Sequence, residues 1–303
     1  QPLLLCTCRM CRAWSKLSNL RGIMKQYIEG ETKAERKARK NANKGCRPLA
    51  ESITPGSAPA KLPINPSDAT RYVVCLKYGT KYSADYVNKL YNMVSRNLTV
   101  QHEFVCFTEN PNGIDERIRV EPIPIMSGVT GWWYKPLFFN PNLILKGTLL
   151  FLDLDMVIFK NIDYLFEYEP TKFCIIRDFN RHVVKNYNKF NSSIFRLTTG
   201  MHSEVYNNFI QSPTSILNRY HGDQDWIRAS ISDGGYAYWP EEWIQSYKWE
   251  MRGKPAFDKG PRGNRDFETN GDPVILDDTS VAVFHGDPNP HNCKDQWVID
   301  NWS

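Results

Sequence analysis

The chain has 303 residues, of which 41% are hydrophobic and 23% are charged, and its formal net charge is +5. This length and balance predict a globular protein with one large or two modest cores, and they exclude a disordered or fibrous chain. No run of eighteen apolar residues occurs, so we expect no membrane-spanning helix.

The positive charge is concentrated near the N-terminus. Residues 1–70 contain thirteen Lys or Arg and five Asp or Glu, a net charge of +8, which leaves about −3 (5 − 8) for residues 71–303. A mildly acidic body does not favour nucleic acid, so we expect no nucleic-acid partner.

Residues 1–47 form a basic segment with four cysteines, Cys6, Cys8, Cys11 and Cys46. Four thiolates can hold zinc, but a second C-x-x-C pair is missing, so a zinc site and unpaired thiols both remain open. The basic segment 12–44 begins as an amphipathic helix, which would contact a membrane surface or a protein partner, or pack on the body. Five prolines then indicate a linker over residues 48–70.

From residue 71 onwards, apolar runs alternate with a helical pattern. The expected strands are Tyr72–Leu76, Glu103–Thr108, Ile118–Ile123 and Thr148–Leu154, and the expected helices are Ser83–Asn97 and Pro136–Phe139. This alternation predicts an α/β domain over residues 71–303, with a mostly parallel sheet covered by helices on both faces. Ligands of such sheets bind beyond the carboxyl ends of the strands.

Three cysteines lie inside these apolar runs, Cys75, Cys106 and Cys174. A reduced thiol in a buried strand behaves as a small hydrophobic side chain. Because disulfides are rare in reducing compartments, this usage predicts a cytoplasmic protein.

Two carboxylates, Asp153 and Asp155, interrupt the apolar run Leu149–Phe159. Burying both beside a strand costs several kcal/mol unless a cation neutralises them. Residues i and i+2 of a strand point to the same side, so the pair suits a hard divalent cation that also binds phosphates. A pair that caps a turn or binds Lys or Arg is the simpler interpretation.

With this motif the sequence resembles glycosyltransferases of the GT-A fold, in particular the glycogenin-like family 8 enzymes and their bacterial and viral relatives. The resemblance covers roughly residues 71–302 and excludes the N-terminal segment. It implies that Asp153 and Asp155 bind Mn²⁺ (or Mg²⁺) and the diphosphate of a nucleotide-sugar donor, expected to be UDP-linked.

Two further stretches are similar to motifs of this family. In Phe190–Phe195, the resemblance implies that Asn191 approaches the donor sugar, although Ser193 replaces the usual Gly. In the Gly222–Trp226 stretch, it implies that the transferred sugar and the reaction centre face three catalytic residues, Asp223, Gln224 and Asp225.

The stretch Val283–His291 is similar to the closing motif of the family, but it departs from that motif twice. The metal-binding His precedes the Phe in the family, whereas His285 follows the Phe here, and Asn289 replaces the phosphate-binding Lys. His285 is therefore the expected third metal ligand, displaced by two residues, and Gly286 is expected to contact the donor. Lys248 or Lys135 is expected to supply the missing cation.

Aromatic residues complete the expected substrate sites. Tyr78 and Gly79 follow the first strand, where the nucleotide base usually binds in this fold. Two aromatic clusters can stack on sugar rings or pack in the core, and both interpretations remain open. They consist of Trp132, Trp133 and Tyr134, and of Tyr236, Tyr238, Trp239, Trp243, Tyr247 and Trp249.

The sequence thus predicts transfer of a sugar to a carbohydrate or glycan acceptor, and the resemblance implies retention of configuration. An inverting enzyme would instead need Asp223 or Asp225 as a base. One rival function is that of a haloacid-dehalogenase-type phosphatase, because Asp153–Val157 fits its motif and Asp277–Asp278 mimics its late acidic pair. A sugar nucleotidyltransferase and an inactive GT-A-like binding protein are two further candidates.

Overall fold

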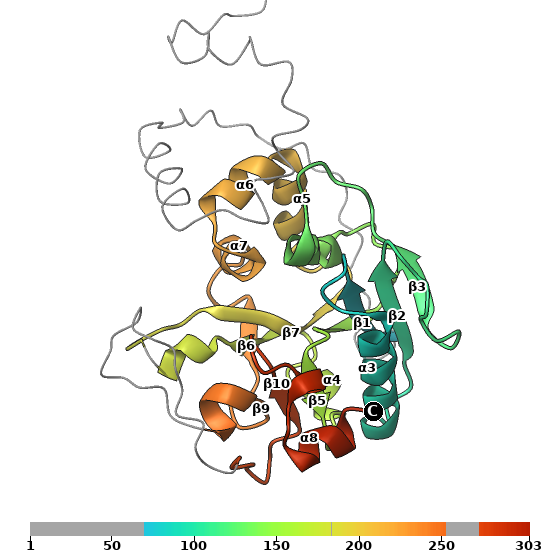
Figure 1. Cartoon of the computed structure of the whole chain (residues 1–303). Coiled ribbons are helices and arrows are strands. Elements are labelled where there is room, and N and C mark those ends of the chain that lie inside the picture. The colour runs from blue at the N-terminus through green and yellow to red at the C-terminus, as the bar shows by residue number, and fades with distance from the viewer. Residues whose placement is uncertain (1–69, 183, 253–272) are drawn as a thin grey trace, which may run out of the picture. The chain divides into compact units, whose positions relative to one another are not determined.

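The computed structural model describes residues 70–182, 184–252 and 273–303, and the structural statements below concern these residues (Figure 1). The predictions for the cysteines of residues 1–47, for the basic helix over 12–44 and for the linker over 48–70 lie outside the described residues.

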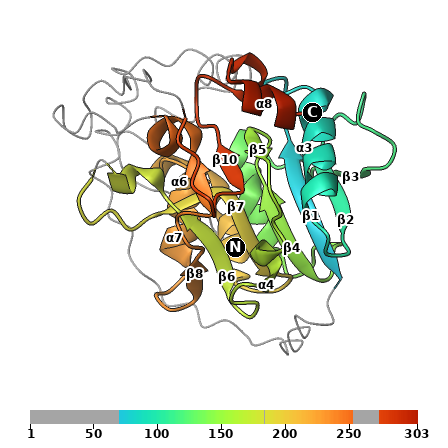
Figure 2. The ribbon, with the colours of Figure 1, turned by 90° about the horizontal axis from the view of Figure 1, so that it is seen from below.

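A seven-stranded sheet forms the centre of the domain, in the order β3-β2-β1-β4-β7-β6-β8 (Figure 2). Strands β1, β2, β3 and β4 are parallel neighbours, β7 is antiparallel to both β4 and β6, and β8 is parallel to β6. The bounds are β1 Arg71–Lys77, β2 Glu103–Thr108, β3 Arg119–Pro122, β4 Thr148–Leu152, β6 Phe173–Arg177, β7 Phe190–Thr198 and β8 Tyr236–Tyr238. The prediction of a mostly parallel sheet is confirmed.

Both faces of this sheet are buried, because alternate side chains of each strand enter different clusters. In β1, Val73 and Cys75 belong to one cluster with helix α3 (Ala84–Asn97), whereas Tyr72 and Val74 belong to a second cluster. The second cluster includes the 3₁₀ helix η2 (Gly131–Phe139) and helices α5 (Glu204–Gln211), α6 (Pro213–Arg219) and α7 (Asp223–Ser230). Figure 1 shows α5, α6 and α7 together on this side.

A small sheet in the order β5-β10-β9 covers part of the first face. Strand β10 pairs antiparallel with β5 and parallel with β9, which brings the late segment of the chain next to the residues that follow β4. The bounds are β5 Met156–Ile158, β9 Ile244–Ser246 and β10 Val281–Val283; the remaining short helices are α4 Tyr164–Glu167, η3 Phe179–His182, η4 Tyr247–Met251 (a π-helix), η6 Pro290–Asn292 and α8 Gln296–Asn301.

The predicted elements exist, most with boundaries shifted by one or two residues, and three differences bear on the predicted site. Strand β4 ends at Leu152, so Asp153 and Asp155 lie in the connection to β5, and the expectation that they share a side as strand residues is wrong. Strand β10 ends at Val283, so His285 is not a strand residue either. Helix η2 begins at Gly131, earlier than predicted, and contains Pro136.

The three cysteines predicted to be buried lie in β1, β2 and β6, and each is a fully buried free thiol. Among the described residues no helix is long and apolar enough to cross a membrane.

Candidate active site

The predicted site residues gather at one edge of the central sheet, where the parallel strands end. Asp153 follows β4 and Asp178 follows β6, and both strands run antiparallel to β7, which begins at this edge with Phe190 and Asn191. Helix α7 carries Asp223 in its first turn and packs against β7. The structure therefore has its polar cluster where an α/β sheet binds ligands.

A buried ammonium group lies at the centre of this cluster. Lys135 Nζ is 2.9 Å from the Asp153 carboxylate, and it also donates to the carbonyl (3.0 Å) and the hydroxyl (3.2 Å) of Ser192. Only 4% of Lys135 is exposed, because η2 runs beneath the second face of the sheet. Burial alone would lower the pKa of Lys135, but the carboxylates of Asp153 and Asp223 outweigh it and raise that pKa.

Asp155, the second carboxylate of the motif, accepts a hydrogen bond of 2.7 Å from the Tyr82 hydroxyl. Burial and the neighbouring charge of Asp153 raise the pKa of Asp155 to about 6, although Tyr82 acts against the shift. Burial and the same interaction raise the pKa of Tyr82 above its ordinary value. A desolvated pair of like charges is the arrangement that a bound cation relieves.

Asp223 is a buried carboxylate of the cluster, with 4% of the residue exposed. Burial raises its pKa, while Lys135 and Ser192 act in the opposite direction. Its Oδ2 atom is buried and has no hydrogen-bond partner in the described part of the chain. Since buried polar atoms are nearly always paired, this oxygen is placed to accept a hydrogen bond from a bound hydroxyl group.

Gln224 and Asp225 turn towards different partners. Gln224 Nε2 donates to Asp178 Oδ2 at 2.9 Å, and Asp178 is also held by the backbone and side-chain amides of Asn180. Asp225 forms an ion pair of 3.1 Å with Lys189, on a more exposed side of α7. The structure thus unites Asp223 with the Lys135 cluster and directs Gln224 to Asp178.

Asn191 lies at the start of β7, and its Oδ1 accepts from the amide of Ser193 at 2.9 Å. The Ser193 carbonyl in turn accepts from the amide of Asp153 at 2.8 Å. This chain of bonds joins the predicted Asn191 segment to the acidic motif.

The late part of the chain approaches the acidic motif through β10. The Phe284 amide donates to the Asp155 carbonyl at 2.9 Å, so the backbone of His285, the next residue, lies near Asp155. The His285 ring stacks on Phe179 at 5.4 Å between centroids, and His285 Nε2 hydrogen-bonds the Ser246 hydroxyl at 2.5 Å.

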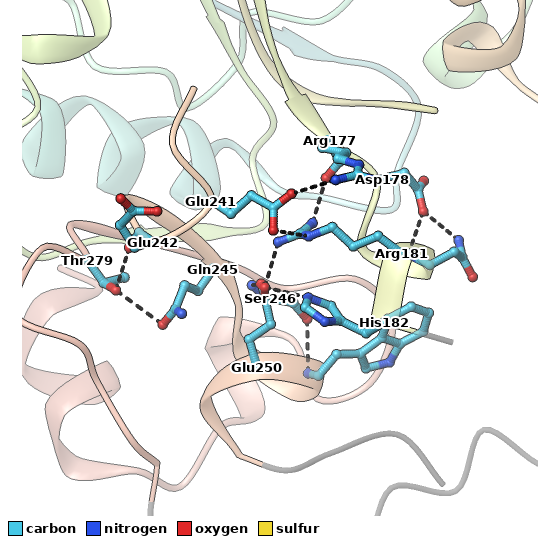
Figure 3. Close-up of polar contacts among 12 residues, drawn as sticks. Arg177, Asp178, Arg181, His182, Glu241, Glu242, Gln245, Ser246, Glu250 and Thr279 are labelled. Carbon is cyan, nitrogen blue, oxygen red and sulfur yellow. Dashed lines mark hydrogen bonds and ion pairs between the residues drawn. The ribbon is translucent and has the colours of Figure 1, made fainter. Parts of the chain in front are cut away.

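An ionic network surrounds Ser246 (Figure 3). Glu250 accepts from the Ser246 amide at 2.7 Å, and its other oxygen lies 2.6 Å from both Arg181 and His182. Arg181 also forms an ion pair with Glu241. The network fixes the segment that contacts His285.

Lys248 and Gly286 are also brought together. Gly286 has a φ of +87°, and a Cβ atom placed on it would lie 3.5 Å from Lys248 Nζ. Burial lowers the pKa of Lys248, and the carboxylate of Asp287 opposes that shift. A half-buried ammonium beside an open backbone turn is suited to an anionic ligand.

Tyr78 and Gly79 follow β1, as predicted. The Tyr78 ring packs on Tyr134 with 5.4 Å between centroids. Gly79 has a φ of +64°, and its amide donates to Glu109 at 2.6 Å.

Sequence reasoning missed four residues of this site: Tyr82, Asp178, Ser192 and Ser246. Asp178 had a usable signal, because it follows the apolar run Phe173–Ile176 after a single residue, which is similar to the pattern of Asp153. Tyr82, Ser192 and Ser246 had none, since their partners are distant in the sequence.

The three predicted metal ligands have protein partners: Lys135 for Asp153, Tyr82 for Asp155 and Ser246 for His285. Within the described ranges no group of three or more His, Cys, Asp or Glu side chains is arranged as a metal site. The metal ligands therefore stay a prediction.

No protein-family profile and no curated protein sequence matches the chain. Among solved structures, the glycosyltransferase GlyE of Streptococcus pneumoniae TIGR4 is similar, with a TM-score of 0.54 and 11% identity over 77% of this chain and 62% of GlyE. The galactosyltransferase LgtC, solved with donor and acceptor sugar analogues, has a TM-score of 0.49 and 13% identity over 76% of this chain and 93% of LgtC. The likeness to GlyE confirms the predicted GT-A fold.

Proposed function

We propose that the chain is a glycosyltransferase that uses a nucleotide-sugar donor, of the glycogenin-like family 8 type. The observation that carries the proposal is the cluster of Lys135, Asp153, Ser192 and Asp223 at the ligand-binding edge of the sheet. A buried ammonium paired with a carboxylate, together with an unpartnered buried oxygen on Asp223, suits a ligand rich in hydroxyl groups.

The proposal includes a divalent cation at the acidic motif. Asp153 and Asp155 would hold Mn²⁺ or Mg²⁺ through oxygen ligands, and His285 is the candidate third ligand because Phe284 is bonded to the Asp155 backbone. The raised pKa of Asp155 supports this assignment, since burial and the neighbouring charge of Asp153 both disfavour its carboxylate and a bound cation would offset them. When bound, the cation would neutralise charge on the departing diphosphate.

The donor would be held by residues from separate elements. Lys248 and Gly286 would bind the phosphates and replace the lysine whose place Asn289 takes, because the ammonium lies beside the glycine turn. Tyr78 and Gly79 would contact the base, which we expect to be uracil. Asn191 and Asp223 would bind hydroxyl groups of the sugar.

In the proposed reaction a hydroxyl group of the acceptor attacks the anomeric carbon, and the bond from that carbon to the diphosphate breaks. Retention of configuration needs no strong base, since the leaving phosphate can take the acceptor proton. Lys135 and Asp223 would then orient the sugar, and Asp178 would hold Gln224 in place at the reaction centre.

The phosphatase function is not favoured. The acidic motif of haloacid-dehalogenase-type phosphatases follows the first strand of the domain. Asp153 instead follows β4, which lies beside β1 in the middle of the sheet. The late acidic pair Asp277–Asp278 lies in an exposed turn.

A panel of nucleotide sugars with Mn²⁺ or Mg²⁺ tests the proposal by release of nucleoside diphosphate. We expect release from at least one donor, loss of release on chelation, and a loss of roughly 100-fold or more in Asp155→Ala. The matched control is Asp115→Ala, which removes an exposed carboxylate paired with Arg117. Hydrolysis of simple phosphomonoesters without nucleotide-sugar turnover would contradict the proposal.

A further inference from the structure

Trp132 is the exposed residue of an otherwise buried helix. It is 58% exposed, whereas the seven residues that follow it in η2, 133–139, are all buried. Indole rings usually bury most of their large apolar area. Exposure of this ring therefore leaves an aromatic face available to a ligand.

The exposed ring lies next to the proposed reaction centre. A Cβ atom placed on Gly222 would lie 3.9 Å from Trp132 Nε1, and Gly222 directly precedes Asp223. Residues three apart in a 3₁₀ helix share one face, so Lys135 lies one turn along from Trp132. The indole edge thus lies next to Gly222, the residue before Asp223, and Gly222 has no side chain that would cover it.

We infer that Trp132 is the stacking platform for a pyranose ring of the acceptor, and this inference rests on the proposed function. A sugar such as β-glucose or β-galactose has C–H groups on one ring face and hydroxyl groups around its rim. The C–H face would lie on the indole, and the rim would be directed towards Asp223 and Gln224. The acceptor class is therefore a saccharide that ends in a pyranose ring.

Other occupants fit this position less well. The nucleotide base is expected after β1, beside Tyr78. The ring of Tyr78 packs on Tyr134. Protein partners need larger apolar patches than one ring, and the seven residues that follow Trp132 within η2 are buried. One exposed ring beside buried polar groups matches one sugar ring.

Steady-state kinetics with the full chain test the inference. We expect Trp132→Ala to raise the KM for a pyranose acceptor about tenfold, and Trp132→Phe to raise it less, while the donor KM stays within about twofold. Gly222→Val should raise the acceptor KM as well, because the valine side chain would fill the space beside the indole. The backbone at residue 222 is extended and can therefore carry a side chain. Ile144→Ala, which removes another exposed apolar side chain, is the control and should change neither KM.

Saturation-transfer NMR separates this inference from the proposed function, because it needs no turnover. Methyl β-glucoside and methyl β-galactoside are the probes, and glycerol is the control without a ring. We expect transfer to the glycosides in wild type and Ile144→Ala but a large loss in Trp132→Ala. If no donor is turned over, the proposed function fails. The NMR comparison still decides whether Trp132 binds a pyranose ring. Equal transfer in wild type and Trp132→Ala, or a rise in donor KM instead of acceptor KM, would overturn it.

Discussion

Lys135 Nζ lies 2.9 Å from the carboxylate of Asp153, across eighteen residues of sequence. This ion pair joins η2 on one face of the sheet to the end of β4. Because Lys135 is buried and bonded to Ser192 as well, its ammonium is fixed in position rather than free to follow the ligand. Several measurable consequences arise from this arrangement and from its neighbours.

Removal of the buried ammonium should cost both activity and stability. Lys135→Met would leave Asp153 and Asp223 without their cation, so we expect a kcat lower by roughly 100-fold or more and a loss of roughly 3 kcal/mol in the free energy of unfolding. Nucleoside diphosphate release and denaturant unfolding measure the two effects. The control is Lys146→Met, which removes an exposed lysine bonded to the Pro141 carbonyl. Wild-type activity in Lys135→Met would show that the ion pair is not part of the site.

Asp155→Asn should stabilise the metal-free protein above pH 6. The pKa of Asp155 is about 6 in the folded chain and about 4 when unfolded, so its stabilising contribution is complete below pH 4 and is lost as the pH rises to 6. Asparagine carries no charge, and we expect a gain of up to about 3 kcal/mol at pH 7.5 and little change at pH 4. Thermal unfolding at both values measures this.

Asp163→Asn is the control of opposite sign. Although burial acts in the other direction, hydrogen bonds from Thr99 lower the pKa of Asp163. Its stabilisation is therefore present above pH 4 and is lost as the pH falls through the lowered pKa. This variant should be less stable than wild type at pH 7.5. A loss of stability in Asp155→Asn at pH 7.5 would contradict the raised pKa of Asp155.

Asp178→Asn should lower kcat about tenfold with little change in KM, because Asp178 holds the Gln224 side chain without touching the donor in the proposed site. Asp178→Glu would keep the charge and recover part of the rate. Lys189→Met, which removes the ion pair with Asp225 on the more exposed side of α7, is the variant for comparison with Asp178→Asn. A rise in donor KM with unchanged kcat would assign Asp178 to donor binding instead.

Lys248→Met should weaken binding of the nucleoside diphosphate about tenfold, because the ammonium lies beside the glycine turn that would contact the phosphates. Isothermal titration calorimetry with UDP measures the effect at fixed Mn²⁺. Lys172→Met, which removes an exposed lysine paired with Glu169, is the control. Equal affinities of wild type and Lys248→Met would leave the phosphate site to other residues.

Arg196 supports the fold away from the site. Its buried guanidinium donates to five backbone carbonyls, those of Leu165, Phe166, Tyr168, Glu169 and Lys172. Arg196→Met would leave these acceptors unpaired, so we expect a loss of about 3–5 kcal/mol in denaturant unfolding. Arg117→Met, at an exposed ion pair with Asp115, is the control and should have a much smaller effect.

The sequence by itself determined the order of the elements. The apolar runs of β1, β2 and β4 and the amphipathic pattern of α3 depend on neighbours within a few residues, so local patterning predicts them. It also placed Asp153 and Asp155 directly after β4, because an acidic residue after an apolar strand is a local signal, whereas Asp223 was predicted from the family resemblance alone.

Tertiary structure alone decided which of these residues meet. Lys135 joins Asp153 because η2 packs against the sheet, Gln224 joins Asp178 because α7 packs against β7, and Lys248 joins Gly286 because β9 pairs with β10. The exposure of Trp132 among buried neighbours was decided in the same way. Such pairings arise from packing between segments that are distant in the chain, and no local periodicity records them.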